Sequence, residues 1–293
     1  MTGAYIYLLV LIALISIIYI LYTPYGESFT NAYELPHIVW SYWEGSEVPK
    51  IVELAHARVK QKLPGWDVRL LDPITVKTYI NMESIPKNYE SLGIQHKADW
   101  IRLALLRDHG GVWLDATIIV NDGAALENLV KESREAHSEF TGFTLGGDSY
   151  IENWFMMAPK GSEVIDKLYT EFSHAITLGF DEYKNELAND SGVNIDPRIY
   201  SFGTYLTQHS CIQAVIQARL GRKPRLVLKP AEESMFKIQT ECNWDFACFI
   251  DKIMKHETYK IPYLKLRNGE KNFDYERYFS EGFIPGGRVG WAN

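Results

Sequence analysis

The sequence predicts an α/β fold with a mixed, mostly parallel sheet, preceded by one N-terminal transmembrane helix. Two observations support this prediction: strand-like and helix-like segments alternate along the chain, and the N-terminus holds a long uncharged apolar run. Hydrophobic residues make up 46% of the 293 residues, which is enough for one sizeable core without the apolar run. We therefore expect an anchor at 1–23, a linker at 24–34 and a single domain at 35–293.

The uncharged apolar run at 4–22 is about as long as a helix that crosses a bilayer. A cleaved signal peptide would need a basic start, a shorter apolar core and a small-residue cleavage site, and the segment has none of them. We expect an uncleaved single-pass membrane anchor. Neither flank carries a nearby lysine or arginine, so the orientation stays open. A Golgi-type enzyme, a bacterial inner-membrane enzyme and a virus-encoded enzyme all fit such an anchor.

Hydrophobic periodicity places the elements of the domain in order. The expected strands are apolar or alternate with a period of two, and they are 35–43, 66–71, 112–114, 141–145, 153–158 and 225–229. The expected helices carry apolar residues three and four apart, and they are 49–62, 95–108, 162–178 and 203–219. Asp72-Pro73 should cap a further helix, and the glycine-rich segment 282–291 predicts a mobile or ligand-closing loop.

The three cysteines are Cys211, Cys242 and Cys248. An odd count without a C-x-x-C pair excludes a cysteine zinc site and a dense disulfide framework. We favour buried free thiols, because free cysteine packs as a small hydrophobic residue. A Cys242–Cys248 bridge is the alternative if the domain lies in an oxidising compartment.

Charge and motifs exclude several classes of protein. The net charge of −7 argues against a nucleic-acid partner, which would select a basic face. The histidines lack H-x-x-H or H-E-x-x-H spacing, which makes a zinc hydrolase a poor fit. The first strand is not followed by G-x-G-x-x-G, and G-x-S-x-G is absent, which argues against a dinucleotide dehydrogenase and an α/β-hydrolase.

The segment 96–117 places charged residues at fixed positions around a helix, a glycine turn and a strand. Asp99 and Arg102 are three apart and share one helix face, and Asp115 follows the strand that begins at Val112. Ligands bind beyond the carboxyl ends of parallel strands, so these side chains could face one pocket. A carboxylate there can ligate Mg²⁺ or Mn²⁺, and an arginine can bind phosphate. The alternative is a surface Asp99–Arg102 pair beside an aspartate that caps a turn.

These residues resemble the signature of glycosyltransferase family 32 and, more closely, of the capsular polysaccharide synthesis proteins. The signature joins an acid and an arginine on a helix to a double glycine, an aromatic residue and a final acid. Here it reads Ala98-Asp99, Arg102, Leu106, Gly110-Gly111, Val112, Trp113 and Asp115. The resemblance covers residues 33 to about 220, and it is weaker in the first strand and at 152–155.

The resemblance implies a GT-A-type, Rossmann-like domain with a UDP- or GDP-sugar donor and a divalent cation, Mn²⁺ or Mg²⁺. It implies that Asp99 and Arg102 bind the nucleotide and that Trp113 lines the donor pocket. Asp115 would be the first acid of a D-x-D motif and the metal ligand. Ala116 and Thr117 complete the motif here, so the ion would draw further ligands from the diphosphate, water and another residue.

Further candidates follow from the resemblance and from position. The expected nucleotide-sugar site also includes Trp40, Tyr42, Asn153, Trp154 and Arg288. The expected catalytic residues are Asp115, Glu152 and Asp148, with Asp196 as another candidate for the general base of an inverting enzyme. Family resemblance favours retention of the anomeric configuration. The alternative for Trp154 is that it packs in the core, and the alternative for Arg288 is that it is a solvated surface arginine.

The sequence thus predicts a membrane-anchored, metal-dependent glycosyltransferase that moves a sugar from a nucleotide-sugar to a glycan or polysaccharide. The alternative is a non-catalytic, membrane-anchored glycan-binding or scaffold protein that kept the fold. An enzyme should gather Asp99, Arg102 and Asp115 in one open pocket with room for a diphosphate. In a scaffold, a core side chain or a salt bridge should fill that space.

Overall fold

The computed structural model describes residues 33–147, 149–255 and 261–280. From Leu35 onward the described residues belong to one compact unit. Among their helices, none is both long and apolar enough to span a bilayer. The predicted anchor, the C-terminal glycine-rich loop, the catalytic candidate Asp148 and the nucleotide candidate Arg288 lie outside the described residues.

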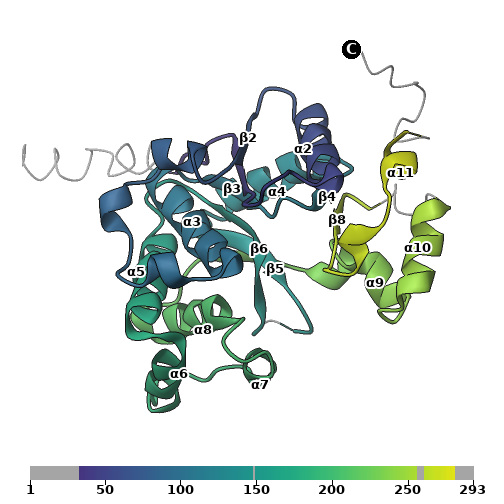
Figure 1. Cartoon of the computed structure of the whole chain (residues 1–293). Helices are drawn as coiled ribbons and strands as arrows, with labels where there is room; N and C mark the ends of the chain where they lie inside the picture. Colours follow the sequence, from purple (N-terminus) through teal and green to yellow (C-terminus); the bar gives the residue numbers. More distant parts are fainter. Residues whose placement is uncertain (1–32, 148, 256–260, 281–293) are drawn as a thin grey trace, which may run out of the picture. The chain divides into compact units, whose positions relative to one another are not determined.

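A mixed sheet of six strands forms the centre of the unit (Figure 1). Its strand order is β2-β1-β3-β6-β5-β7. Its strands are β1 Ile38–Tyr42, β2 Asp67–Leu71, β3 Gly111–Leu114, β5 Phe140–Thr144, β6 Ile151–Ala158 and β7 Leu226–Pro230. The pairs β1–β2, β1–β3 and β5–β7 are parallel, which confirms the predicted mixed, mostly parallel sheet. Strand β6 runs antiparallel to β3 and to β5, so it begins at the sheet edge where β1 and β3 end.

Helices cover both faces of this sheet (Figure 1). The described residues form the α-helices α2 Lys50–Lys62, α3 Ile94–His109, α4 Gly123–Glu135, α5 Glu163–Leu178, α6 Phe180–Ala188, α7 Pro197–Tyr200, α8 Thr207–Ala214, α9 Lys237–Glu241, α10 Phe246–Met254 and α11 Glu276–Ser280. Neighbouring strand residues face opposite sides, so Trp40 and Trp113 pack under α3, α5 and α8. Val39 and Val112 pack on the other face, with α2 and α4.

The turn between α3 and β3 depends on its two glycines. Gly110 and Gly111 have φ angles of 70° and 98°, which are left-handed conformations that side chains rarely adopt. A Cβ atom on Gly111 would lie 2.7 Å from the carbonyl oxygen of Ile38 in the neighbouring strand. The glycine turn therefore lets β3 pack directly beside β1. It also determines how far Asp115, after β3, lies from Asp99 and Arg102 on α3.

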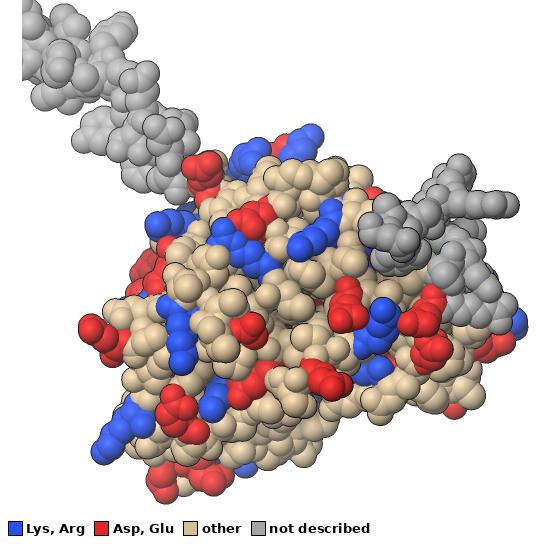
Figure 2. All heavy atoms as spheres, turned by 45° about the horizontal axis from the view of Figure 1, so that its top comes forward, with Lys and Arg blue, Asp and Glu red and all other residues tan. Residues whose placement is uncertain are grey.

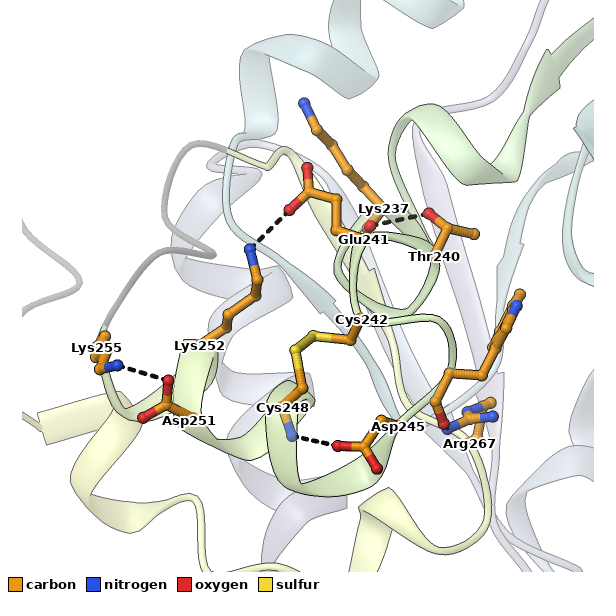
Figure 3. The surroundings of a disulfide bond; sticks show 11 residues. Lys237, Thr240, Glu241, Cys242, Asp245, Cys248, Asp251, Lys252, Lys255 and Arg267 are labelled. Atoms are coloured by element: carbon orange, nitrogen blue, oxygen red, sulfur yellow. Dashed lines mark hydrogen bonds and ion pairs between the residues drawn. A yellow bond between two sulfur atoms is a disulfide. The ribbon is translucent and has the colours of Figure 1, made fainter.

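The C-terminal part adds a second, two-stranded antiparallel sheet of β4 Ile118–Val120 and β8 Tyr263–Lys265. It also contains a disulfide between Cys242 and Cys248, which joins the end of α9 to α10 (Figure 3). The prediction of free thiols is therefore wrong for these two residues. The reason is the turn between the helices, where Asp245 caps α10 by accepting a hydrogen bond from the Cys248 backbone N–H at 2.7 Å. Cys211 is a buried free thiol, as expected.

Candidate active site

A cavity of about 610 Å³ opens where β1 and β3 end and β6 begins. This size lies within the range of small-molecule sites in proteins, so a nucleoside diphosphate can be accommodated. Most of the predicted site residues line it, namely Tyr42, Asp99, Arg102, Trp113, Asp115, Glu152, Asn153 and Trp154. They meet because β6 is antiparallel, which brings its first residues beside the end of β3.

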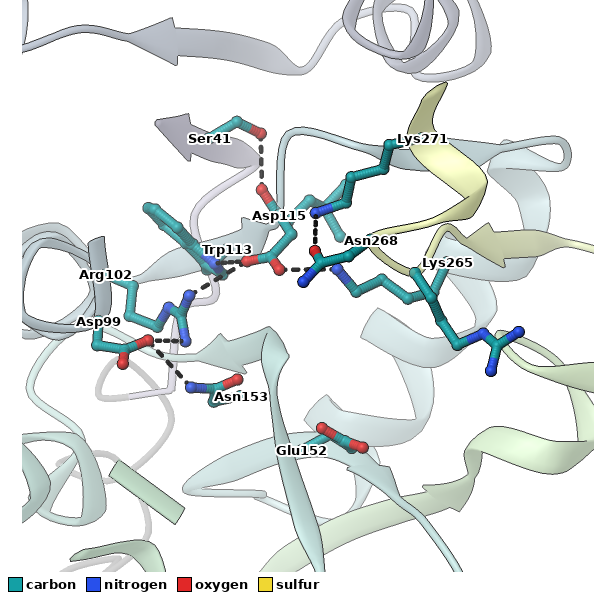
Figure 4. A network of polar contacts seen from close by, with 12 residues as sticks. Ser41, Asp99, Arg102, Trp113, Asp115, Glu152, Asn153, Lys265, Asn268 and Lys271 are labelled. Atoms are coloured by element: carbon teal, nitrogen blue, oxygen red, sulfur yellow. Dashed lines mark hydrogen bonds and ion pairs between the residues drawn. The ribbon is translucent and has the colours of Figure 1, made fainter. Parts of the chain in front are cut away.

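Arg102 links the two acids of the signature at the floor of the cavity (Figure 4). Its buried guanidinium lies 2.7 Å from Asp99 Oδ1 through Nη1 and 3.2 Å from Asp115 Oδ1 through Nη2. The guanidinium carbon lies 5.1 Å from the centroid of the Trp113 ring. Burial raises the pKa of the Asp99 carboxyl, and the charge of Arg102 opposes this rise. The alternative of an exposed Asp99–Arg102 surface pair is therefore wrong.

Gln208 is a member of this network that the sequence motif did not identify. Its fully buried amide donates from Nε2 to the backbone oxygen of Asp99 at 2.7 Å. Its Oε1 accepts hydrogen bonds from Arg102 Nη1 and from Asn153 Nδ2, both at 2.9 Å. Asn153 also donates to Asp99 Oδ1 at 3.1 Å. The sequence gives only a weak signal for Gln208, which lies in the polar run Thr207-Gln208-His209-Ser210 of the expected helix 203–219.

Lys265 is the second residue that the sequence analysis missed. It lies opposite Ile118 in the β4–β8 ladder, and its Nζ lies 2.9 Å from Asp115 Oδ2. The other carboxylate oxygen of Asp115 accepts hydrogen bonds from Arg102 and from Trp113 Nε1, at 3.2 and 3.1 Å. Burial raises the pKa of the Asp115 carboxyl, but the charges of Lys265 and Arg102 outweigh it and hold this pKa at about 2.

A buried pair of Glu152 and His209 forms another part of the cavity wall. Glu152 Oε2 lies 3.3 Å from His209 Nε2. The other ring nitrogen of His209 is buried and has no hydrogen-bond partner among the described residues. Because Glu152 reaches the cavity and has a ring nitrogen beside it, this carboxylate can take part in proton transfer at a bound ligand.

Several other candidates are placed by packing. Trp154 lines the cavity, but the residue is only 4% exposed and its ring stacks on Phe143 with 5.4 Å between centroids, so packing is its main role. Trp40 does not line the cavity, because its buried Nε1 donates to the Gly110 carbonyl oxygen at 2.9 Å beneath α3. Asp196 caps α7 and forms an ion pair with Arg198 at 2.6 Å. It is not among the residues that line the cavity.

The side chains around Asp115 do not form a set of ligands that fits a divalent cation. Both carboxylate oxygens already accept from cationic groups, Arg102 on one side and Lys265 on the other. Ala116 and Thr117 follow where a D-x-D motif would supply another acid. Across the described ranges, no group of three His, Cys, Asp or Glu side chains is placed to hold a metal ion. The requirement for Mn²⁺ or Mg²⁺ stays a prediction.

One face of the molecule carries both acidic and basic side chains, without a patch of a single charge among the described residues (Figure 2). Figure 2 shows acidic and basic side chains intermixed over that face of the described residues. The expectation that nucleic acid is not a partner stays a prediction based on the net charge of −7.

Comparisons with known proteins agree with the sequence motif. The family model for capsular polysaccharide synthesis protein matches residues 18–175, more than half of the chain. The O-glycosyltransferase PaGT of Phomopsis amygdali is 25% identical over 154 residues, covering 46% of this chain and 38% of that protein. The O-glycosyltransferase braB of Annulohypoxylon truncatum is 27% identical over 153 residues, covering 44% and 35%. The chain therefore spans little more than a third of the length of these curated relatives.

Solved structures with lower similarity include a glycosyltransferase involved in the glycosylation of the major capsid of PBCV-1. It has a TM-score of 0.41 and 12% identity, and the match covers 80% of this chain and 94% of that chain. The PaToxG glycosyltransferase has a TM-score of 0.40 and 10% identity, with 85% and 84% covered. These scores support no conclusion of their own. The family model, in contrast, matches more than half of the chain, and it shows that this protein belongs to the capsular polysaccharide synthesis protein family.

Proposed function

We propose that the domain transfers a sugar from a nucleotide-sugar donor, UDP- or GDP-linked, to a glycan or polysaccharide acceptor. The observation that carries this proposal is the open cavity of about 610 Å³ in which Asp99, Arg102 and Asp115 meet. Membership of the capsular polysaccharide synthesis protein family and the names of the curated O-glycosyltransferase relatives support it. A membrane anchor at 1–23 and retention of the anomeric configuration complete the proposal, on the sequence alone.

The chemistry of the proposed reaction is the departure of a nucleoside diphosphate from the anomeric carbon. Negative charge grows on the leaving diphosphate, and preorganised cations lower the free energy of that state. Arg102 and Lys265 are held at the cavity floor by Asp99 and Asp115, so both cations are in place before the donor arrives. Trp113 lies against Arg102 and limits access of water to its guanidinium. Glu152 faces the cavity from the start of β6 and is our candidate for the carboxylate that acts on the acceptor or the anomeric centre.

The non-catalytic alternative predicted that a core side chain or salt bridge would fill the site. The Asp115–Lys265 ion pair is such a contact, but the cavity beside it still has a volume of about 610 Å³. We therefore favour the enzyme.

The test is release of nucleotide from a panel of UDP-, GDP- and CMP-sugars by the full chain, with Mn²⁺ and with EDTA, in the presence of oligosaccharide acceptors. Release from one donor that depends on an acceptor would support the transferase. Neither nucleotide release nor nucleotide binding by calorimetry across the panel would favour the scaffold.

A further inference from the structure

We propose that Lys265 and Lys271 bind the diphosphate of the donor, at the place where the D-x-D resemblance implies a divalent cation, and that Asp115 positions Lys265. The ligand class is therefore a nucleoside diphosphate bound through ammonium groups. This inference rests on the proposed function, since it names the groups that hold the donor in that cavity.

The position of Lys265 is fixed by its backbone on two sides. Its N–H donates to the Met235 carbonyl oxygen at 3.0 Å, and its carbonyl oxygen accepts from Gln239 Nε2 at 2.8 Å. Gln239 is fully buried and also donates to Glu270 Oε2 at 3.0 Å. The opposite strand of the ladder holds Lys265 across from Ile118, three residues after Asp115. The ammonium group therefore reaches Asp115 from a rigid frame, and the Lys265 side chain is only 10% exposed.

The loop after Lys265 is built around the buried carboxylate of Glu270. Arg267 donates to this carboxylate from its backbone N–H at 2.8 Å and from Nε at 2.7 Å. The hydroxyl of Tyr275 donates to the Glu270 carbonyl oxygen at 2.7 Å. The positive charge of Arg267 is thereby compensated by Glu270, and this cation takes a structural role at the cavity rim.

Lys271 is left as a cation of the cavity without a carboxylate partner. Its Nζ donates to Asn268 Oδ1 at 3.2 Å (Figure 4), and within the described part of the chain it forms no ion pair. Burial and the neighbouring charge of Lys265 lower the pKa of the Lys271 ammonium group. An anion between these two lysines would stabilise both charged ammonium groups, because it would pair with each of them.

The charge balance of the floor favours an anion over a second cation. Asp99 and Asp115 pair with Arg102 and Lys265, and Lys271 adds a positive charge beside this set. The other two carboxylates of the lining, Glu44 and Glu152, have Tyr42 and His209 as their partners. A diphosphate carries at least two negative charges and can accept hydrogen bonds from both ammonium groups. A divalent cation at Asp115 would have to displace Lys265 or Arg102 from the carboxylate and would then lie next to like charge.

The experiment is calorimetric titration of the full 293-residue chain with UDP and GDP, in EDTA and in Mn²⁺, with uridine and guanosine as comparators. We expect one diphosphate to bind in EDTA. Lys265→Met should weaken this binding by about 10- to 100-fold and leave the affinity for the nucleoside unchanged, because one charge-assisted contact to phosphate is lost. Lys271→Met should weaken it by at least about 5-fold, and Lys265→Arg should restore most of the affinity.

The matched control is Lys229→Met, which removes a lysine from an ion pair with Glu132 outside the cavity lining. It should leave nucleotide affinity unchanged, and a thermal melt of each variant checks that it is folded. Binding that requires Mn²⁺ and is insensitive to Lys265→Met and Lys271→Met would overturn this inference and leave the proposed function standing. A chain that binds none of the nucleotides in either condition would overturn the proposed function and this inference with it.

Discussion

Asp115 and Lys265 lie 150 positions apart in the sequence, yet Asp115 Oδ2 and Lys265 Nζ are 2.9 Å apart at the floor of the cavity. The pair joins the end of β3 to the end of β8, so the local motif at 98–115 and the C-terminal part share one site. The charge of Lys265 therefore acts directly on the Asp115 carboxylate.

Replacing Asp115 with alanine should lower turnover by about 100-fold or more. The carboxylate holds both Lys265 and Arg102, and without it these cations lose their preorganised positions around the leaving group. Initial rates of nucleotide release at saturating donor would measure the loss. Asp108→Ala is the control, because Asp108 pairs with Arg107 outside the cavity lining. Unchanged transfer by Asp115→Ala would remove Asp115 from the active site.

The same carboxyl group should make stability depend on pH at the acidic end. The pKa of Asp115 falls from 3.8 to about 2 on folding, so its contribution is complete above pH ~4 and is lost as the pH falls towards ~2. The size is on the order of 2 kcal/mol of unfolding free energy. Urea unfolding of wild type and Asp115→Asn between pH 2 and 5 would measure the difference. In Lys265→Met this pH dependence should shrink, since one of the two cations is gone, and an undiminished slope would contradict the assignment.

Gln208→Leu should weaken nucleotide binding and also destabilise the fold by roughly 1–3 kcal/mol. It leaves the Asp99 carbonyl oxygen and one contact each of Arg102 and Asn153 unsatisfied in a buried place. Gln213→Leu is a matched control from the same helix, because its buried amide bonds Ser149 and Asp196 instead. Calorimetry and chemical unfolding should show similar destabilisation of both variants and lost affinity only in Gln208→Leu. Equal affinities would restrict Gln208 to a structural role.

Glu152→Gln should lower turnover by roughly 10²- to 10⁴-fold with little change in KM, as expected for a group that transfers a proton. The amide keeps the shape and a hydrogen-bonding oxygen beside His209 but cannot act as a base. Glu171→Gln tests a partly buried glutamate outside the cavity lining, where Arg219 is its partner. A pH–rate profile that keeps the same shape in Glu152→Gln would argue against a role in proton transfer.

Opening the Cys242–Cys248 bridge should lower stability by about 2 kcal/mol, because the two cysteines are 6 positions apart and close a short loop. Thermal melts with and without reductant would measure it in the wild type. The double variant Cys242→Ser/Cys248→Ser should melt lower than the oxidised wild type and should not respond to reductant. The same melting temperature in all four samples would show that the bridge does not form in solution.

Local sequence was enough to predict the centre of the site. Asp99, Arg102 and Asp115 are placed by one helix period, one glycine turn and one short strand, all within a single stretch of the chain. Short-range geometry of this kind depends little on the rest of the fold, so the motif predicted a shared pocket that the structure contains. The alternation of strands and helices likewise predicted the α/β class and the mixed sheet.

Long-range pairing decided the rest. Hydrophobic periodicity does not encode strand direction, so the antiparallel course of β6, which brings Glu152 and Asn153 to the end of β3, came only from the folded sheet. The β4–β8 ladder brought Lys265 to Asp115, and helix α8 brought Gln208 under Arg102 from 106 positions away. Trp40 packs beneath α3, whereas Tyr42, two residues further along the same strand, reaches the cavity. These contacts join segments that are distant in the chain, and only the free energy of packing them together determines which side chains meet.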